Sequence, residues 1–266
     1  MSQLKFTGSF LCVMIVSQIF SSFVIALSFI SVIPIPQKII PLWNSHTLRC
    51  FCVMLPVVGV LFSLLWSAIW HVLTLPQNLS PILRGFFMMF CTLALTGGLH
   101  LDGLMDTCDA IFSRRDRQTR LQILSDTHAG SFAVMGCVLV VLAKSLLFSE
   151  LLSLTTNHYT LITIPVYSRL GMAVLLNTLP FAKTGGLAVM LGGSRRKRDN
   201  LFFAAMMLLL LPFTPKTLTL SFVLCFLAWR KICLRIFGGI TGDLLGAFVE
   251  VSEVIMLVGM VISQCM

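Results

Sequence analysis

Long apolar runs, separated by short polar stretches, dominate this chain of 266 residues. A membrane-spanning helix needs about 20 mostly apolar residues. Eight segments approach or reach that length: 10–33, 51–74, 82–99, 132–153, 160–180, 201–213, 217–229 and 246–262. The runs are continuous and of helix length, unlike the alternating pattern of barrel strands. The pattern predicts an all-α, polytopic transmembrane helix bundle of about 7–8 spans, forming one integral membrane domain over residues 1–266.

The Lys and Arg residues test the number of crossings. With eight spans, 14 of them fall in the loops 35–50, 100–131, 181–200 and 230–245. Three fall on the opposite side, whose loops include 75–81 and 154–159. Basic residues mark cytoplasmic loops, so the first four loops are expected in the cytoplasm and both termini outside. Segments 201–213 and 217–229 are short and separated by two prolines; they are two tilted spans or one interrupted span, and the charges favour two.

The composition agrees with a protein dissolved in lipid. Only 11% of the residues are charged and 57% are hydrophobic, whereas soluble domains carry about 25% charged residues. The net charge of +9 would suit nucleic-acid binding, but the basic residues lie where loops are expected, so we infer a lipid bilayer as partner and no nucleic acid. The nine cysteines show no CxxC pair and no metal-binding spacing, so neither a disulfide nor a zinc site is expected.

Acidic residues are few, and five of the ten crowd between residues 102 and 126. If residues 102–109 are helical, Asp102, Asp106 and Asp109 share one face, at i, i+4 and i+7. Like charges at this spacing repel, and no Lys or Arg lies between residues 85 and 113. Mg²⁺ is commonly held by one or two carboxylates together with substrate phosphates. We therefore expect these three aspartates to bind Mg²⁺; the alternative is a solvated acidic face at a helix end.

Basic residues close to this acidic run are candidates for binding an anionic substrate. Arg114 and Arg120 follow it directly and either bind phosphate or mark the cytoplasmic side. Arg169 lies within an apolar segment, where a charge needs a partner, and its guanidinium could bind phosphate. His100 is a metal ligand, a base or a polar tip at the membrane interface.

A second acidic group lies near the C-terminus, after the glycine-rich stretch 238–246. Glu250 follows Asp243 by seven residues and would share its helix face. Glu253 lies inside an apolar run, where an unpaired carboxylate is costly. We expect the two acidic segments to pack together and build one site, with Asp243 near the metal and Glu250 paired with Arg169 or Lys144. The alternative is that the glycines form only a flexible turn.

Several motifs lie in a fixed order along the chain around the core Asp102-Gly-x-x-Asp106-Thr-x-Asp109: Leu27 to Pro36, Thr96 to Asp109, Leu121 to Gly130, Ser168-Arg169, and Gly238 to Ala247 followed by Glu250. In sequence and in order these motifs resemble those of the cobalamin synthase (adenosylcobinamide-GDP ribazoletransferase) family. The chain departs from the family pattern at Ala110, at Ser125 and His128 where basic residues are usual, and after Phe181.

The resemblance implies a membrane transferase that joins adenosylcobinamide-GDP to α-ribazole or its 5′-phosphate, releases GMP and uses Mg²⁺. It implies a catalytic group of Asp102, Asp106, Asp109 and Asp126, with Asp126 as a further metal ligand or as the base for the ribazole hydroxyl. Substrate contacts are expected from a second set of residues: His100, Arg114, Arg120, Arg169, Asp243 and Glu250. The expected location is a bacterial inner membrane with a cytoplasmic active site, and an oligomer is compatible with the sequence.

Two other classes of protein share some of these features. CDP-alcohol phosphotransferases also carry clustered aspartates in membrane helices, and Gly98, Asp102 and Asp106 fit half of their pattern. The other half has no counterpart in this chain. An ion or metabolite transporter would place its acids near the bilayer midplane, whereas these acids cluster at predicted cytoplasmic ends.

Overall fold

The computed structural model describes residues 2–36, 38–39, 48, 50–76, 78–154, 161–186, 190–191 and 195–265, with side chains from residue 16 to residue 264 of these. Within this part the chain is built from helices and contains no named strand: α1 (Ser2–Ile30), α2 (Phe51–Thr74), α3 (Pro81–Thr96), α4 (Leu99–Phe112), α5 (Arg117–Ile123), α6 (Ser131–Ser153), α7 (Thr163–Thr178), α9 (Asp199–Leu210), η3 (Leu211–Phe213), α10 (Lys216–Ile232), the π-helical turn η4 (Cys233–Phe237) and α11 (Gly242–Cys265). The predicted all-α class is confirmed.

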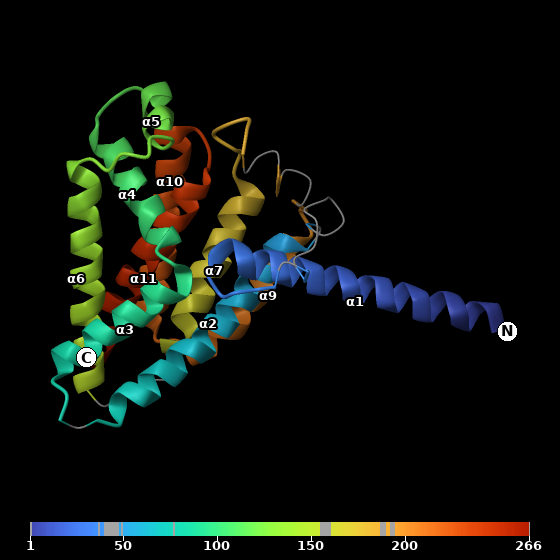
Figure 1. Cartoon of the computed structure of the whole chain (residues 1–266), viewed down its shortest axis with the longest axis horizontal. Coiled ribbons are helices and arrows are strands. Elements are labelled where there is room, and N and C mark those ends of the chain that lie inside the picture. Colours follow the sequence, from blue (N-terminus) through green and yellow to red (C-terminus); the bar gives the residue numbers. More distant parts are fainter. Residues whose placement is uncertain are drawn as a thin grey trace.

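The helices form a bundle whose main pairs are α2 with α7, α3 with α6, and α11 with both α4 and α10. Figure 1 shows α1 running away from this bundle toward the N-terminus. Several pairs meet at a glycine: a Cβ on Gly59 of α2 would touch Pro165 of α7, and one on Gly85 of α3 would touch Ser145 of α6. Small residues at such crossings let helix backbones approach closely, as is common in membrane bundles.

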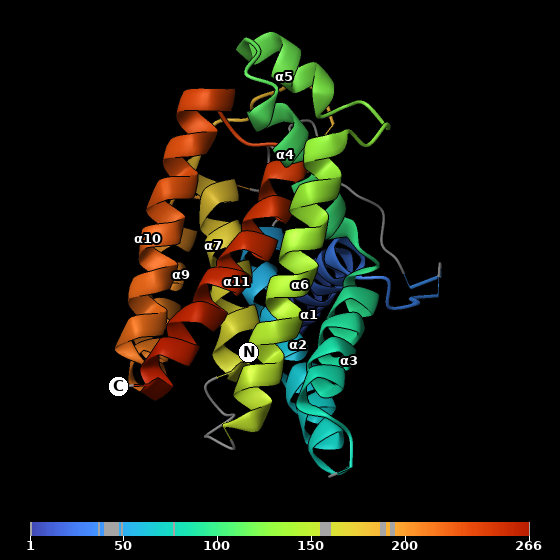
Figure 2. The same ribbon diagram turned by 90° about the vertical axis from the view of Figure 1, so that its left-hand side faces the viewer.

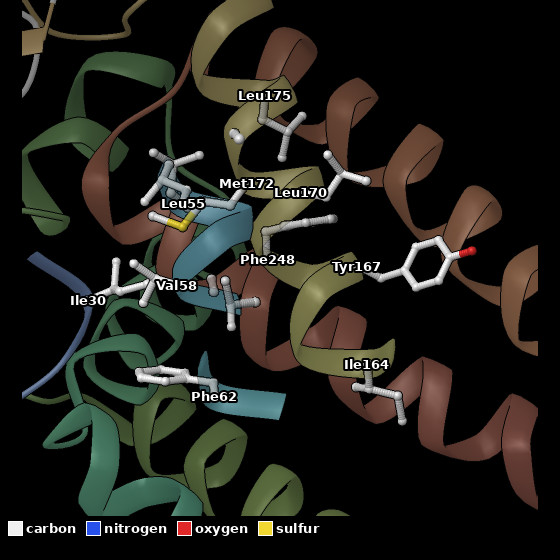
Figure 3. Close-up of a cluster of buried hydrophobic side chains, with 14 of the residues drawn as sticks. Ile30, Leu55, Val58, Phe62, Ile164, Tyr167, Leu170, Met172, Leu175 and Phe248 are labelled. Atoms are coloured by element: carbon white, nitrogen blue, oxygen red, sulfur yellow. The ribbon is translucent and has the colours of Figure 1, made fainter. Parts of the chain in front are cut away.

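The apolar core lies where α2, α7 and α11 meet. Phe62 from α2, Tyr167 from α7 and Phe248 from α11 are all buried within it, and Figure 3 shows these side chains among Leu55 and Met172. Between helices in lipid, such side chains stabilise the fold through close van der Waals packing rather than through removal of apolar surface from water.

The outer surface of the bundle is apolar as well. On α6, Leu139 is 66% exposed and Leu142 is 53% exposed. A soluble protein rarely exposes large apolar patches, so this face is suited to lipid. The helices α2, α6 and α11 are long and apolar enough to cross a membrane, and α3 with α4 would do so as one bent pair. The protein is therefore a helical membrane protein; the larger number of about 7–8 spans stays a prediction.

Most predicted segments match helices to within a few residues, with two informative differences. The segment 82–99 does not run on as one helix: α3 ends at Thr96, and α4 starts at Leu99 after a bend of 92°. The predicted loop 100–131 is largely helical, because it contains α4 and α5. The segments 201–213 and 217–229 correspond to separate helices, α9 with η3 and then α10. Most of loops 35–50 and 154–159 lies outside the described residues.

Candidate active site

A two-glycine corner sets the direction of α4, which carries the acidic motif. Gly97 and Gly98 have φ angles of +60° and +76°, a left-handed conformation that costs side-chain-bearing residues about 1–2 kcal/mol each. A Cβ on Gly97 would also collide with Val32, in the segment after α1. The backbone N–H of Val32 donates to the Leu95 oxygen at 3.2 Å. The corner therefore turns the chain away from α3 and brings the segment after α1 beside the start of α4.

The acidic helix α4 crosses the start of α11 at two glycines. A Cβ on Gly103 would lie 2.7 Å from the backbone oxygen of Asp243, and one on Gly246 would lie 3.2 Å from the backbone of α4. This close approach places Asp243 near enough to Asp102 and Asp106 for their charges to repel. Figures 1 and 2 show α4 and the start of α11 together, next to α5. The prediction that the two acidic segments pack together is confirmed.

Asp109, the third motif aspartate, is held by hydrogen bonds from the start of α6. Its Oδ2 accepts a hydrogen bond of 2.6 Å from the N–H of Gly130, and its Oδ1 accepts one of 2.9 Å from the N–H of Ala133. Both donors belong to the start of α6, where the helix dipole favours an anion. Asp109 therefore caps α6 and fixes α4 against it.

This capping changes the predicted metal site. Within the described part of the chain, no group of three His, Cys, Asp or Glu side chains is placed to hold a metal ion. Asp102, Asp106 and Asp109 are therefore not assembled as a ready three-carboxylate site. Asp102 is exposed and Asp106 is half-buried, and this pair remains available. Two carboxylates fit Mg²⁺, since this ion usually keeps waters and takes further ligands from substrate phosphates.

Asp116 and Asp126 lie on the same end of the bundle as α5. Asp116 caps α5 by accepting hydrogen bonds from the N–H groups of Gln118 and Thr119, at 2.9 and 3.1 Å. Asp126 is exposed, and its Oδ1 lies 2.7 Å from Nδ1 of His128 and 3.0 Å from the backbone nitrogen of His128. The hydrogen bond to the His128 ring, followed by the one to its backbone, lowers the pKa of Asp126. An acid of low pKa is a weak base, so this position suits a ligand better than a proton acceptor.

The predicted phosphate-binding arginines surround this end of the bundle. Arg114 is exposed and has a φ of +54°, directly after the C-terminus of α4. Arg120 is half-buried on α5, and its Nε has no hydrogen-bond partner. The guanidinium of Arg117 lies over Gly238, where a Cβ would meet its Cζ at 2.1 Å. The basic segment after α4 therefore contacts the turn that precedes α11.

Arg169 and Glu250 are buried inside the bundle. Lys144 Nζ lies 2.7 Å from Glu250 and 2.7 Å from Glu253, and Arg169 pairs with Glu253. Ser168 also donates to Glu253, at 3.1 Å. The predicted pairing of Glu250 with Lys144 is confirmed. Since the charges of Arg169 and Glu250 are matched within the protein, their contact with substrate stays a prediction.

His100 is also buried, and it lies at the crossing of α4 and α11. It is 2% exposed, and its Nε2 has no hydrogen-bond partner. It lies on the helix turn that carries Asp102, directly opposite Gly246. His100 is therefore placed behind the carboxylates rather than on their open side.

Two open hollows flank the crossing. The first, of about 570 Å³, is lined by Asp102 together with Ser28, Ser31, Thr96 and Met105. The second, of about 640 Å³, is lined by Asp243 together with Ser125, Lys183 and Thr241 among others. Sequence reasoning did not select Ser28, Ser31 or Lys183 as site residues. Ser28 and Ser31 lie within the family-like segment Leu27 to Pro36, and Lys183 lies in the stretch after Phe181 that departs from the family pattern.

These features define a class: a helical membrane protein with a carboxylate-rich, open site where α4 meets α11. A sequence model of the family described as cobalamin-5-phosphate synthase matches residues 22–261. The chain belongs to this family.

Individual relatives agree with the family match. An adenosylcobinamide-GDP ribazoletransferase of Halalkalibacterium halodurans is 35% identical over 242 residues, which cover 86% of this chain and 90% of that protein. One from Pseudomonas fluorescens is 33% identical and covers 90% of this chain and 98% of that protein. One from Desulfitobacterium hafniense is 32% identical and covers 88% of this chain and 94% of that protein. No solved structure matches the chain.

Proposed function

We propose that this protein is the membrane transferase that joins adenosylcobinamide-GDP to α-ribazole or its 5′-phosphate, forming adenosylcobalamin or its phosphate and releasing GMP. The relatives that cover most of the chain carry this activity in their names. The observation that supports it best is the crossing of α4 and α11, which gathers the motif carboxylates Asp102, Asp106 and Asp243 between two hollows. Two hollows suit a reaction with two substrates.

In this reaction a ribose hydroxyl of the acceptor attacks the phosphorus nearer the cobinamide. A new O–P bond forms, the bond from that phosphorus to the bridging oxygen breaks, and GMP leaves with this oxygen while the hydroxyl loses its proton. Bound Mg²⁺ would neutralise charge on the diphosphate. Asp102 and Asp106 are the residues that would hold it, and Arg114 and Arg120 would bind phosphate oxygens. Asp109 acts indirectly, because it anchors α4 to α6.

We further propose that the site faces the cytoplasm of the cell that makes it, in the inner membrane if the source is a bacterium. The arginines around α5 support this orientation because basic residues collect on the cytoplasmic side. A nucleotide-activated donor is also a cytoplasmic metabolite by its chemistry, since nucleotides do not cross bilayers unaided.

The test is to incubate purified protein in detergent with adenosylcobinamide-GDP, α-ribazole and Mg²⁺, and to follow GMP and the cobalamin product together. Both should appear in equal amounts, and a chelator should stop their formation until Mg²⁺ is restored. Production of GMP without a joined product would mean simple hydrolysis and would contradict the proposal. CDP-alcohol substrates in parallel incubations should give no CMP.

A further inference from the structure

The hollow beside Asp243 is built from two segments that are tied together by backbone hydrogen bonds. Phe181 and Ile240 form a short parallel bridge. The N–H of Ala182 donates to the Ile240 oxygen and the N–H of Ile240 donates to the Pro180 oxygen, each at 2.9 Å. The walls of the hollow are therefore held by main-chain contacts and do not depend on a flexible side chain.

The inner surface of this hollow is suited to an anion. Lys183 is the cation among the residues that line it, and three hydroxyl groups, from Ser125, Thr184 and Thr241, accompany it. A Cβ added at Gly185 or at two other lining glycines, Gly186 and Gly242, would meet no atom within 4 Å. A ligand can therefore approach the backbone there directly, as phosphates do at glycine-rich segments.

Lys183 is held in place at this surface. Its Nζ donates a hydrogen bond to Ser125 Oγ, which follows α5. Its charge also acts on Asp243 across the hollow, although the two do not form a salt bridge. Nearby, the guanidinium of Arg195 stacks on the Phe181 ring, with its centre 3.5 Å from the ring centroid. Lys183 thus presents a cation to the hollow, and Asp243, at the start of α11, presents a carboxylate to it.

The position of Asp243 links this hollow to the carboxylate pair. Asp243 lines the hollow and its charge also acts on Asp102. A diphosphate could therefore contact Lys183 at one end and a Mg²⁺ held by Asp102 and Asp106 at the other. We propose that this hollow is the binding site for the nucleoside diphosphate of the donor, and that Lys183 binds its phosphate. This inference rests on the proposed function, since it takes a nucleotide-activated donor as the substrate.

A binding experiment with GDP tests this directly, in the full-length protein with Mg²⁺ and without any corrinoid. Lys183→Met should weaken GDP binding about tenfold to a hundredfold, as expected when a charge-assisted hydrogen bond is lost. Lys183→Arg should recover much of the affinity. Lys197→Met is the matched control, because Lys197 is exposed and lines neither hollow; it should bind GDP like the unmodified protein.

Two further measurements separate phosphate binding from other roles of Lys183. The KM for unphosphorylated α-ribazole and for α-ribazole 5′-phosphate should not change in Lys183→Met, whereas the KM for the donor should rise. Unchanged GDP affinity in Lys183→Met would overturn the proposal. So would a rise confined to the KM of α-ribazole 5′-phosphate, which would assign the hollow to the acceptor, or a Lys183→Arg protein as weak as Lys183→Met, which would indicate a packing role. GDP binding requires no turnover, so the binding results, unlike the KM values, are independent of whether GMP is released in the assay of the proposed function.

Discussion

Asp106 lies among the other acidic side chains of the site. Its carboxylate is repelled by those of Asp102, Asp243, Asp109 and Asp126, and no Lys or Arg lies on the same helix. A group held among like charges is costly unless a cation is bound. This is the physical reason to expect that Asp106 matters more for metal binding than for folding.

Replacing Asp106 with Asn should abolish turnover and leave the protein folded in the membrane. Because the change removes repulsion, thermal stability without Mg²⁺ should stay the same or rise. Mg²⁺ should raise the unfolding temperature of the unmodified protein and should have a much smaller effect on Asp106→Asn. The measurement is thermal unfolding in detergent with and without Mg²⁺. Loss of the folded protein in Asp106→Asn would show that the residue is structural.

Arg114 combines a strained backbone with an exposed guanidinium. Its φ of +54° follows the end of α4, a position where glycine is preferred because other residues lose about 1–2 kcal/mol. Arg114→Gly should therefore increase the free energy of unfolding by about 1 kcal/mol, and should raise the KM for the donor if Arg114 binds phosphate. Arg115→Gly removes the same charge without relieving such strain, so it should not stabilise. A less stable Arg114→Gly protein would contradict this account.

At the residue scale, the sequence predicted the face of α4 but not the partners of each aspartate. The spacing of Asp102, Asp106 and Asp109 is a local property that follows from helical periodicity. The capping of α6 by Asp109 depends on how α6 returns to α4, and the sequence contains no local signal for that approach. Lys183 was missed for the same reason, since the bridge between Phe181 and Ile240 joins segments about sixty residues apart.

At the element scale, the sequence did not distinguish the roles of the glycines. The predicted span 82–99 contains Gly97 and Gly98, whereas in the structure these adjacent left-handed residues end α3 and redirect the chain. Gly103 and Gly246 proved to be the contact points of α4 and α11. A glycine in a sequence permits both a turn and a close crossing, and only the position of the neighbouring helix distinguishes them.

The buried charges of α6, α7 and α11 also act at the scale of elements. Lys144, Arg169, Glu250 and Glu253 form a neutral group of two cations and two anions inside the bundle. Removing one member leaves an uncompensated charge, which typically costs about 3–5 kcal/mol in a buried pair. The sequence predicted such pairing from the high cost of lone charges in apolar runs.

Lys144→Met should accordingly reduce the free energy of unfolding by about 3–5 kcal/mol. The double substitution Lys144→Met with Glu250→Gln should recover part of this loss, because it restores a neutral group with Arg169 and Glu253 still paired. Unfolding by denaturant in detergent measures both. Lys216→Met, at the start of α10, is the control and should have little effect. A double variant no more stable than Lys144→Met would mean that charge balance is not what holds these helices together.

At the scale of the whole molecule, the hydrophobic pattern was sufficient for the fold class, because continuous apolar runs of helix length leave few alternatives in a membrane. It was not sufficient for the path of the chain near the site. The acidic segment was expected to be a loop, yet α4 continues from α3 at 92°, since a broken span and a span followed by a loop have the same composition.

The distribution of basic residues predicts the orientation of the bundle in the membrane, and this prediction can be tested on the described loops. Gln118 on α5 and Asn78 between α2 and α3 are both exposed and are predicted to lie on opposite sides of the membrane.

Gln118→Cys should react with a membrane-impermeant thiol reagent only when the cytoplasmic face is open, as in inverted vesicles. Asn78→Cys should react in intact, right-side-out vesicles, where the cytoplasmic face is closed to the reagent. Both substitutions are made in a chain whose native cysteines have been replaced, because Cys50, Cys91, Cys108 and Cys137 are only partly buried and would otherwise add background labelling. Labelling of both positions from one side would exclude the predicted topology, and with it the cytoplasmic position of the site. If Gln118→Cys were labelled only from outside, the site would face away from the nucleotide pool that its donor requires.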